Sequence, residues 1–152
     1  MKKSVVSVPL ALLLAVLFTW NADAGVLKIR PDELKPRNST ESYTATPEFA
    51  GGPVVVQATV NLPARVTLKR LIHFSSNGLE GKSAVTLYRV KMGEHSERMA
   101  ETISDTQNYP DIEEVATSDI TNPVILPGYT YYLVVLIVNN NTLFRGVKLV
   151  YQ

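Results

Sequence analysis

The chain contains no cysteine. This absence excludes a disulfide framework, a metal site built on thiolates and a cysteine nucleophile. Histidine is scarce as well, because His73 and His95 are the only two. Two histidines are too few for a zinc site with three histidine ligands, although a mixed ligand set stays open. Alternation places His73 on the polar side of its segment, and His95 lies in the expected turn 91–95. We therefore expect both histidines to be structural or solvated.

Several catalytic motifs are also missing. No serine lies in a Gly-x-Ser-x-Gly pattern, and neither Gly-x-x-x-x-Gly-Lys nor His-Glu-x-x-His occurs. These patterns mark nucleophilic serines, phosphate-binding loops and zinc proteases. Their absence argues against the commonest hydrolases and nucleotide enzymes.

The sequence has no excess of charge of either sign. It contains 15 basic and 14 acidic residues, and removing the first 24 residues takes away Lys2, Lys3 and Asp23, which leaves 13 of each. A neutral domain has no strong field to attract nucleic acid or an anionic membrane surface. We therefore expect no nucleic acid partner.

The first 24 residues have the pattern of a secretory signal peptide. Lys2 and Lys3 give a basic start, a mostly apolar run follows, and Ala22 and Ala24 are the small residues that a signal peptidase reads. The apolar run is shorter than the ~20 residues that a membrane span needs. We predict cleavage after Ala24 and a secreted bacterial protein, periplasmic or extracellular. The remainder, 25–152, is expected to be one domain with no membrane span.

Proline, glycine and asparagine divide this remainder into short β-prone segments, and no sustained helical period occurs. Only Pro31 is placed to open a single helical turn. The segments expected as strands are 26–30, 40–46, 54–60, 66–74, 84–90, 98–103, 113–117, 129–138 and 143–152. Their spacing predicts an all-β fold, an antiparallel β-sandwich of seven to nine strands with a jelly-roll-like topology. An immunoglobulin-like topology is the alternative, although its Cys-Trp-Cys spacing is absent.

Two segments carry specific predictions about packing. In 66–74 the expected inward face is Val66, Leu68, Ile72 and Phe74, and Arg70 interrupts it without an explanation in the sequence. The segment 129–138 is apolar on both alternating faces, which predicts a central strand covered on both sides. A short polar connector separates it from 143–152, which predicts a β-hairpin.

Three pieces of the sequence carry a resemblance: Pro36-Arg37-Asn38-Ser39-Thr40, then Asn61-Leu62-Pro63, and finally Tyr129-Thr130-Tyr131-Tyr132-Leu133 with the closing Arg145-Gly146-Val147-Lys148-Leu149-Val150-Tyr151. They resemble a loose group of uncharacterised bacterial secreted β-sandwich proteins that have no assigned activity. The resemblance covers most of 25–152. It implies a jelly-roll-like sandwich and no particular chemistry.

The tyrosines are the best candidates for recognition. Tyr88 is outward by alternation and Tyr109 lies in a loop, so we expect these two to be exposed and to bind a ligand. An exposed aromatic ring on a rigid sheet can stack on a sugar or anchor a protein partner. The sequence thus predicts a non-catalytic module that binds an unidentified carbohydrate or protein surface, or belongs to an extracellular assembly.

Acidic side chains concentrate between Glu101 and Asp119. Asp105, Asp111 and Asp119 could supply oxygens to a calcium ion as a cofactor, but the regular spacing of calcium loops is missing. We therefore favour a solvated acidic edge that opposes aggregation between strands. The alternative function is a small secreted hydrolase with carboxylates from 101–119, because such pairs are brought together by folding.

Overall fold

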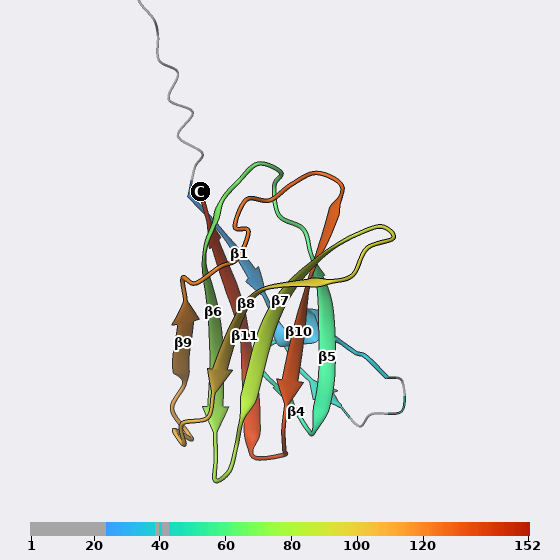
Figure 1. Ribbon diagram of the computed structural model, residues 1–152. Coiled ribbons are helices and arrows are strands. Elements are labelled where there is room, and N and C mark those ends of the chain that lie inside the picture. The colour runs from blue at the N-terminus through green and yellow to red at the C-terminus, as the bar shows by residue number, and fades with distance from the viewer. Residues whose placement is uncertain (1–23, 39, 41–42) are drawn as a thin grey trace, which may run out of the picture.

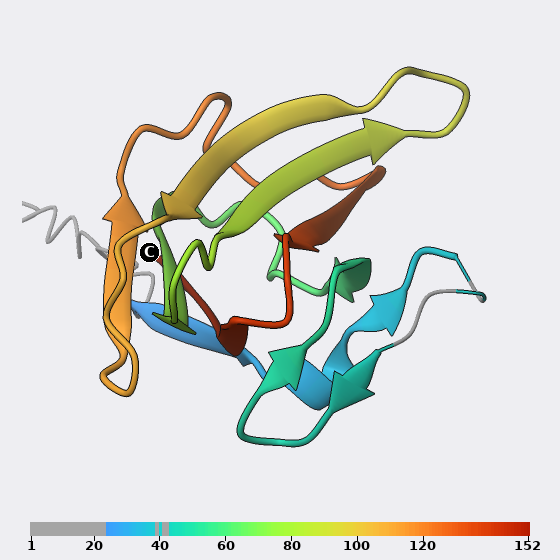
Figure 2. The same ribbon diagram turned by 90° about the horizontal axis from the view of Figure 1, so that it is seen from below.

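The computed structural model describes residues 24–38, 40 and 43–152, in which two antiparallel sheets pack face to face (Figures 1 and 2). The predicted signal peptide, apart from Ala24, lies outside the described residues. The predicted antiparallel β-sandwich is confirmed. Its one helical turn in the described part of the chain is η1 (Pro31–Glu33), with Pro31 at the start as expected. No helix in those residues approaches the length and apolarity of a membrane span.

The strands divide into a six-stranded sheet A and a five-stranded sheet B. Sheet A has the order β3 (Thr44–Ala45), β4 (Ala50–Gly51), β11 (Thr142–Tyr151), β6 (Leu68–Asn77) and β9 (Glu113–Thr117), and β1 (Gly25–Ile29) also pairs with β11. Sheet B has the order β2 (Lys35–Pro36), β5 (Val54–Val60), β10 (Tyr129–Ile137), β7 (Ser83–Lys91) and β8 (Glu97–Ser104). The chain crosses between sheets at β5–β6–β7 and again at β9–β10–β11, which is a jelly-roll-like arrangement.

The predicted C-terminal hairpin is wrong. β10 pairs with β5 and β7 in sheet B, whereas β11 pairs with β6, β4 and β1 in sheet A. The connector therefore carries the chain from one sheet to the other. It is tied to the β6–β7 turn, because Asn139 Nδ2 donates to the carbonyl oxygen of Glu80 at 2.7 Å and Asn141 Nδ2 donates to that of Leu79 at 2.9 Å. Both flanking runs are equally β-prone, so their composition does not reveal which sheet each one joins.

A β-bulge in β6 explains the position of Arg70. The register between β6 and β11 skips Lys69, and one extra residue reverses the alternation beyond it. Leu71 then faces the core, while Ile72 and Phe74 lie on the outer face with Arg70. The predicted inward positions of Ile72 and Phe74 are wrong for this reason, and Arg70 interrupts no apolar face.

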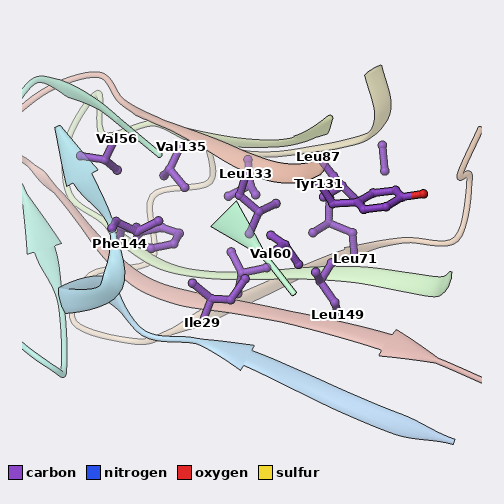
Figure 3. Close-up of a cluster of buried hydrophobic side chains, with 14 of the residues drawn as sticks. Ile29, Val56, Val60, Leu71, Leu87, Tyr131, Leu133, Val135, Phe144 and Leu149 are labelled. Carbon is purple, nitrogen blue, oxygen red and sulfur yellow. The ribbon is translucent and has the colours of Figure 1, made fainter. Parts of the chain in front are cut away.

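The inner faces of the two sheets enclose the hydrophobic core (Figure 3). Its labelled members include Ile29, Val56, Leu87, Leu133 and Phe144. Burying each such side chain contributes roughly 1.5–3 kcal/mol. β10 is central in its sheet, as predicted, but its outer face is not covered, since Leu136 there is 42% exposed.

One end of the core, next to the β6–β7 turn, is polar. Ser75 Oγ and Asn77 Nδ2, from sheet A, both donate to Ser104 Oγ of sheet B at 2.6 Å. Ser104 in turn donates to the carboxylate of Glu113 on β9. Because a buried polar group is costly when unpaired, this network ties the two sheets together at that end.

His73 lies within this polar end, not on the polar side of its strand as predicted. The bulge at Lys69 turns His73 inward, and its side chain is 0% exposed. Its Nε2 atom is 2.9 Å from Ser83 Oγ, and its ring centroid is 5.7 Å from that of Phe144. Burial disfavours the imidazolium and lowers the pKa of His73 to about 4.

The free energy of unfolding should therefore decrease as the pH falls from about 6.5 to about 4. The unfolded chain binds a proton at the ordinary pKa of 6.5, whereas the folded chain binds it only near 4, so protons favour unfolding across that window. The stabilisation by neutral His73 is complete above this window. The free energy of unfolding lost across the window is about 3 kcal/mol, at ~1.36 kcal/mol per pKa unit. Urea unfolding at a series of pH values measures it.

The variant His73→Gln should lose this pH dependence, and the exposed-histidine variant His95→Gln should retain it. The same slope of stability against pH in both variants would assign the acid effect to other groups.

Candidate functional site

Two tyrosines form a stacked pair on the outer face of sheet B. Tyr132 on β10 lies directly opposite Tyr88 on β7. Their ring centroids are 5.3 Å apart and their planes differ by 15°. The Tyr132 hydroxyl donates to Ser96 Oγ at 2.8 Å, which fixes the outer end of the ring. Two adjacent, hydrogen-bonded strands thus hold a rigid, half-buried aromatic surface.

A hollow of about 500 Å³ lies beside this pair, and Tyr132 forms its aromatic wall. The other lining residues come from η1, β2, β5 and β10 and are mostly polar: Glu33, Lys35, Gln57, Ala58, Thr59 and Thr130. They offer both hydrogen-bond donors and acceptors. Tyr88 does not line the hollow, so its contribution there is to support the Tyr132 ring.

Fixed polar groups continue the surface toward β8. Arg98 lies opposite Tyr88 in the register. Glu101 accepts hydrogen bonds from Thr86 Oγ1 and from Arg98 Nη1, each at 3.1 Å. Aromatic, neutral polar and ion-paired groups therefore follow one another across the outer face of sheet B. A ligand with apolar C–H faces and many hydroxyls matches such a surface.

The structure does not bring the two predicted tyrosines together. Tyr88 lies in the later half of β7, whereas the backbone N–H of Tyr109 donates to the Asn77 carbonyl oxygen at 3.0 Å, at the end of the sandwich. Tyr109 is 64% exposed and lines a separate hollow of about 400 Å³ with Leu79 and Asn140. The binding role of either tyrosine stays a prediction.

Sequence reasoning missed Tyr132 as a site residue. Alternation assigns it to the face of β10 that carries Val134 and Leu136, and that face was predicted to be covered. The useful signal is the pairing of β10 with β7, which aligns Tyr132 with Tyr88. This pairing joins residues that are far apart in the sequence, so the residue pattern of either strand alone does not predict it.

The acidic segment does not form a metal-binding cluster. Asp105, Asp111 and Asp119 are all exposed, and within 24–38, 40 and 43–152 no three histidine, cysteine, aspartate or glutamate side chains are grouped to hold a metal ion. Glu101 and Asp119 do line one small hollow of about 240 Å³. Both carboxylate oxygens of Glu101 are already engaged by Thr86 and Arg98.

Neither a family model nor a curated protein matches the chain. Solved structures do match its fold. A xylan-binding module, CBM15, has a TM-score of 0.54 at 9% identity and covers 84% of this chain and 96% of its own. The CBM36-1 domain of a multidomain xylanase from the hindgut metagenome of Trinervitermes trinervoides has a TM-score of 0.51 at 10% identity. The match covers 83% of this chain and 96% of that domain. A family 6 carbohydrate-binding module has a TM-score of 0.51 at 8% identity, and the match covers 80% of this chain and 90% of that module. At these identities the likeness shows the fold alone, and it agrees with the predicted jelly-roll-like sandwich.

The exposed aspartates give a direct test of the calcium prediction. Because the three carboxylates do not converge, adding calcium or a chelator should leave the thermal unfolding temperature unchanged. Scanning calorimetry with calcium and with EDTA measures this. The triple variant Asp105→Asn, Asp111→Asn, Asp119→Asn is the control. A calcium-dependent rise that this variant abolishes would restore the predicted site.

Proposed function

We propose that this protein is a secreted, non-catalytic module that binds a glycan on the outer face of sheet B. The observation that carries the proposal is the hollow walled by Tyr132, which places one aromatic surface among side chains that both donate and accept hydrogen bonds. A pyranose ring has an apolar face that packs on an aromatic ring and hydroxyls that need such partners. The fold shared with carbohydrate-binding modules supports the same reading.

The site is prepared for binding before any ligand arrives. Gln57 and Thr59 project from β5 opposite Val134 and Tyr132 of β10, so the strand pairing sets their positions. Glu33 Oε1 accepts from Arg30 Nε at 3.2 Å. Since few of these groups have to be ordered on binding, little conformational entropy opposes association. A longer glycan continues from the hollow over the tyrosine pair toward Arg98 and Glu101.

Secretion is part of the proposal. The first strand, β1, begins at Gly25, directly after the predicted cleavage point, so cleavage there leaves the strand whole. Expression in a bacterial host with the full chain should give an exported product whose N-terminal residue is Gly25, as read by N-terminal sequencing. A product that retains Met1 in the cytoplasm would contradict the signal peptide.

A hydrolase remains the second candidate, because Glu101 and Asp119 line one hollow. Release of reducing ends from a polysaccharide measures such an activity directly. Release that Glu101→Gln abolishes would replace the binding module by the hydrolase.

The Tyr132→Ala variant should weaken glycan binding about tenfold or more, since losing an aromatic contact worth at least ~1.4 kcal/mol changes affinity by that factor. Tyr88→Ala should weaken it less, because Tyr88 does not line the hollow. Affinity electrophoresis in soluble xylan, galactan, mannan and laminarin, followed by titration calorimetry, measures both effects.

The exposed-tyrosine variant Tyr109→Ala is the matched control and should bind as the parent does. A loss confined to Tyr109→Ala would move the site to the end of the sandwich. Failure of the parent protein to bind any of the four polysaccharides would count against the tyrosine face as a site for neutral glycans.

A further inference from the structure

Cationic side chains gather on the outer face of sheet A, opposite the tyrosine face. Lys28 of β1 lies directly across from Lys148 of β11. Both point outward, since Ile29 and Leu149 beside them lie in the core. Like charges directly opposite each other destabilise a sheet. Neither lysine forms an ion pair with any of the described residues.

A second bulge adds an arginine to this face. The register of β11 with β6 shifts between Phe144 and Gly146, which turns Arg145 outward. Gly146 permits the bulge, because its φ of +128° is strained for other residues and a Cβ there would meet the Ile29 carbonyl oxygen at 3.0 Å. The Arg145 Nε atom is buried and has no hydrogen-bond partner among the residues that the structure describes.

Aromatic rings hold these cations in place without neutralising them. The Lys148 ammonium lies 4.5 Å from the centroid of the Phe74 ring, and the Arg145 guanidinium lies 5.7 Å from that of Phe49. A cation–π contact attracts the cation but leaves its full charge available to a ligand. An ion pair would have cancelled that charge.

The two cations line one groove of about 460 Å³, together with Glu48, Phe74 and Ile112. Ile112 is 57% exposed and gives the groove an apolar wall. The groove thus combines two positive groups, one carboxylate and an apolar surface. Its volume is that of a site for a small ligand.

We propose that this groove binds an acidic sugar residue, a pyranose ring that bears a carboxylate. The carboxylate contacts Lys148 and Arg145, and the ring packs against Ile112 and Phe74. Its negative charge offsets the repulsion between Lys28 and Lys148. Glu48 accepts hydrogen bonds from sugar hydroxyls, which a run of acidic residues in a peptide does not supply. The site lies on the other sheet and is independent of the Tyr132 hollow.

Titration of the Tyr132→Ala variant with oligogalacturonate tests this proposal, because that background removes the wall of the other hollow. Binding should be strong at low ionic strength and weak at high ionic strength. A neutral oligogalactose of equal length should not bind. Lys148→Met should weaken binding about tenfold, as expected for a lost charge-assisted contact. The charge-matched control Lys82→Met, at an exposed position outside the groove, should bind normally.

The variant Lys28→Glu separates this role from a structural one. Its carboxylate would pair with Lys148, so it should raise the unfolding temperature at low ionic strength while removing oligogalacturonate binding. Unchanged binding in Lys28→Glu or in Lys148→Met would overturn the proposal. Binding of polyglutamate as tight as that of oligogalacturonate would overturn the sugar as ligand and indicate an acidic protein partner.

Discussion

Burial of the inner face of β10 is the constraint on which the rest of the structure depends. Tyr131, Leu133 and Val135 fill the space between the sheets and are at most 4% exposed. Because side chains alternate along a strand, their burial forces Tyr132 and Val134 onto the outer face. A shift of one residue would place Tyr132 in the core and remove the aromatic wall of the candidate site. The same packing that stabilises the fold therefore determines the chemistry of its surface.

Periodicity was sufficient to predict strands but not their partners. The segments 54–60 and 113–117 match β5 and β9 at both ends, since each is a short run of β-formers bounded by breakers. The position of β11 in the opposite sheet from β10 could not be predicted, because the connector is as short as a hairpin loop. The bulges at Lys69 and Arg145 were also missed, since neither residue type marks an extra position in a strand. The tyrosine pair and the cationic groove depend on these pairings and bulges, so sequence reasoning found Tyr88 but neither surface.

The two outer faces offer different chemistry on one scaffold. Sheet B presents stacked rings with neutral and ion-paired polar groups, whereas sheet A presents cations that rest on Phe74 and Phe49. The polar end of the core joins the sheets through Ser104, which receives hydrogen bonds from Ser75 and Asn77. The predicted sensitivity of the fold to acid lies at His73, whose side chain points into the core and not onto either face. The expected loss of stability at low pH thus arises from the interior and not from the groups that would contact a ligand.

The bulge at Lys69 makes β6 tolerant of substitution and intolerant of a change in length. Many side chains can replace the exposed lysine, but removing one residue there would exchange the two faces of the strand beyond it. Ile72 and Phe74 would turn into the core, and Leu71 and His73 would turn out to solvent. In a set of natural variants, this position should therefore accept many amino acids and almost no deletions.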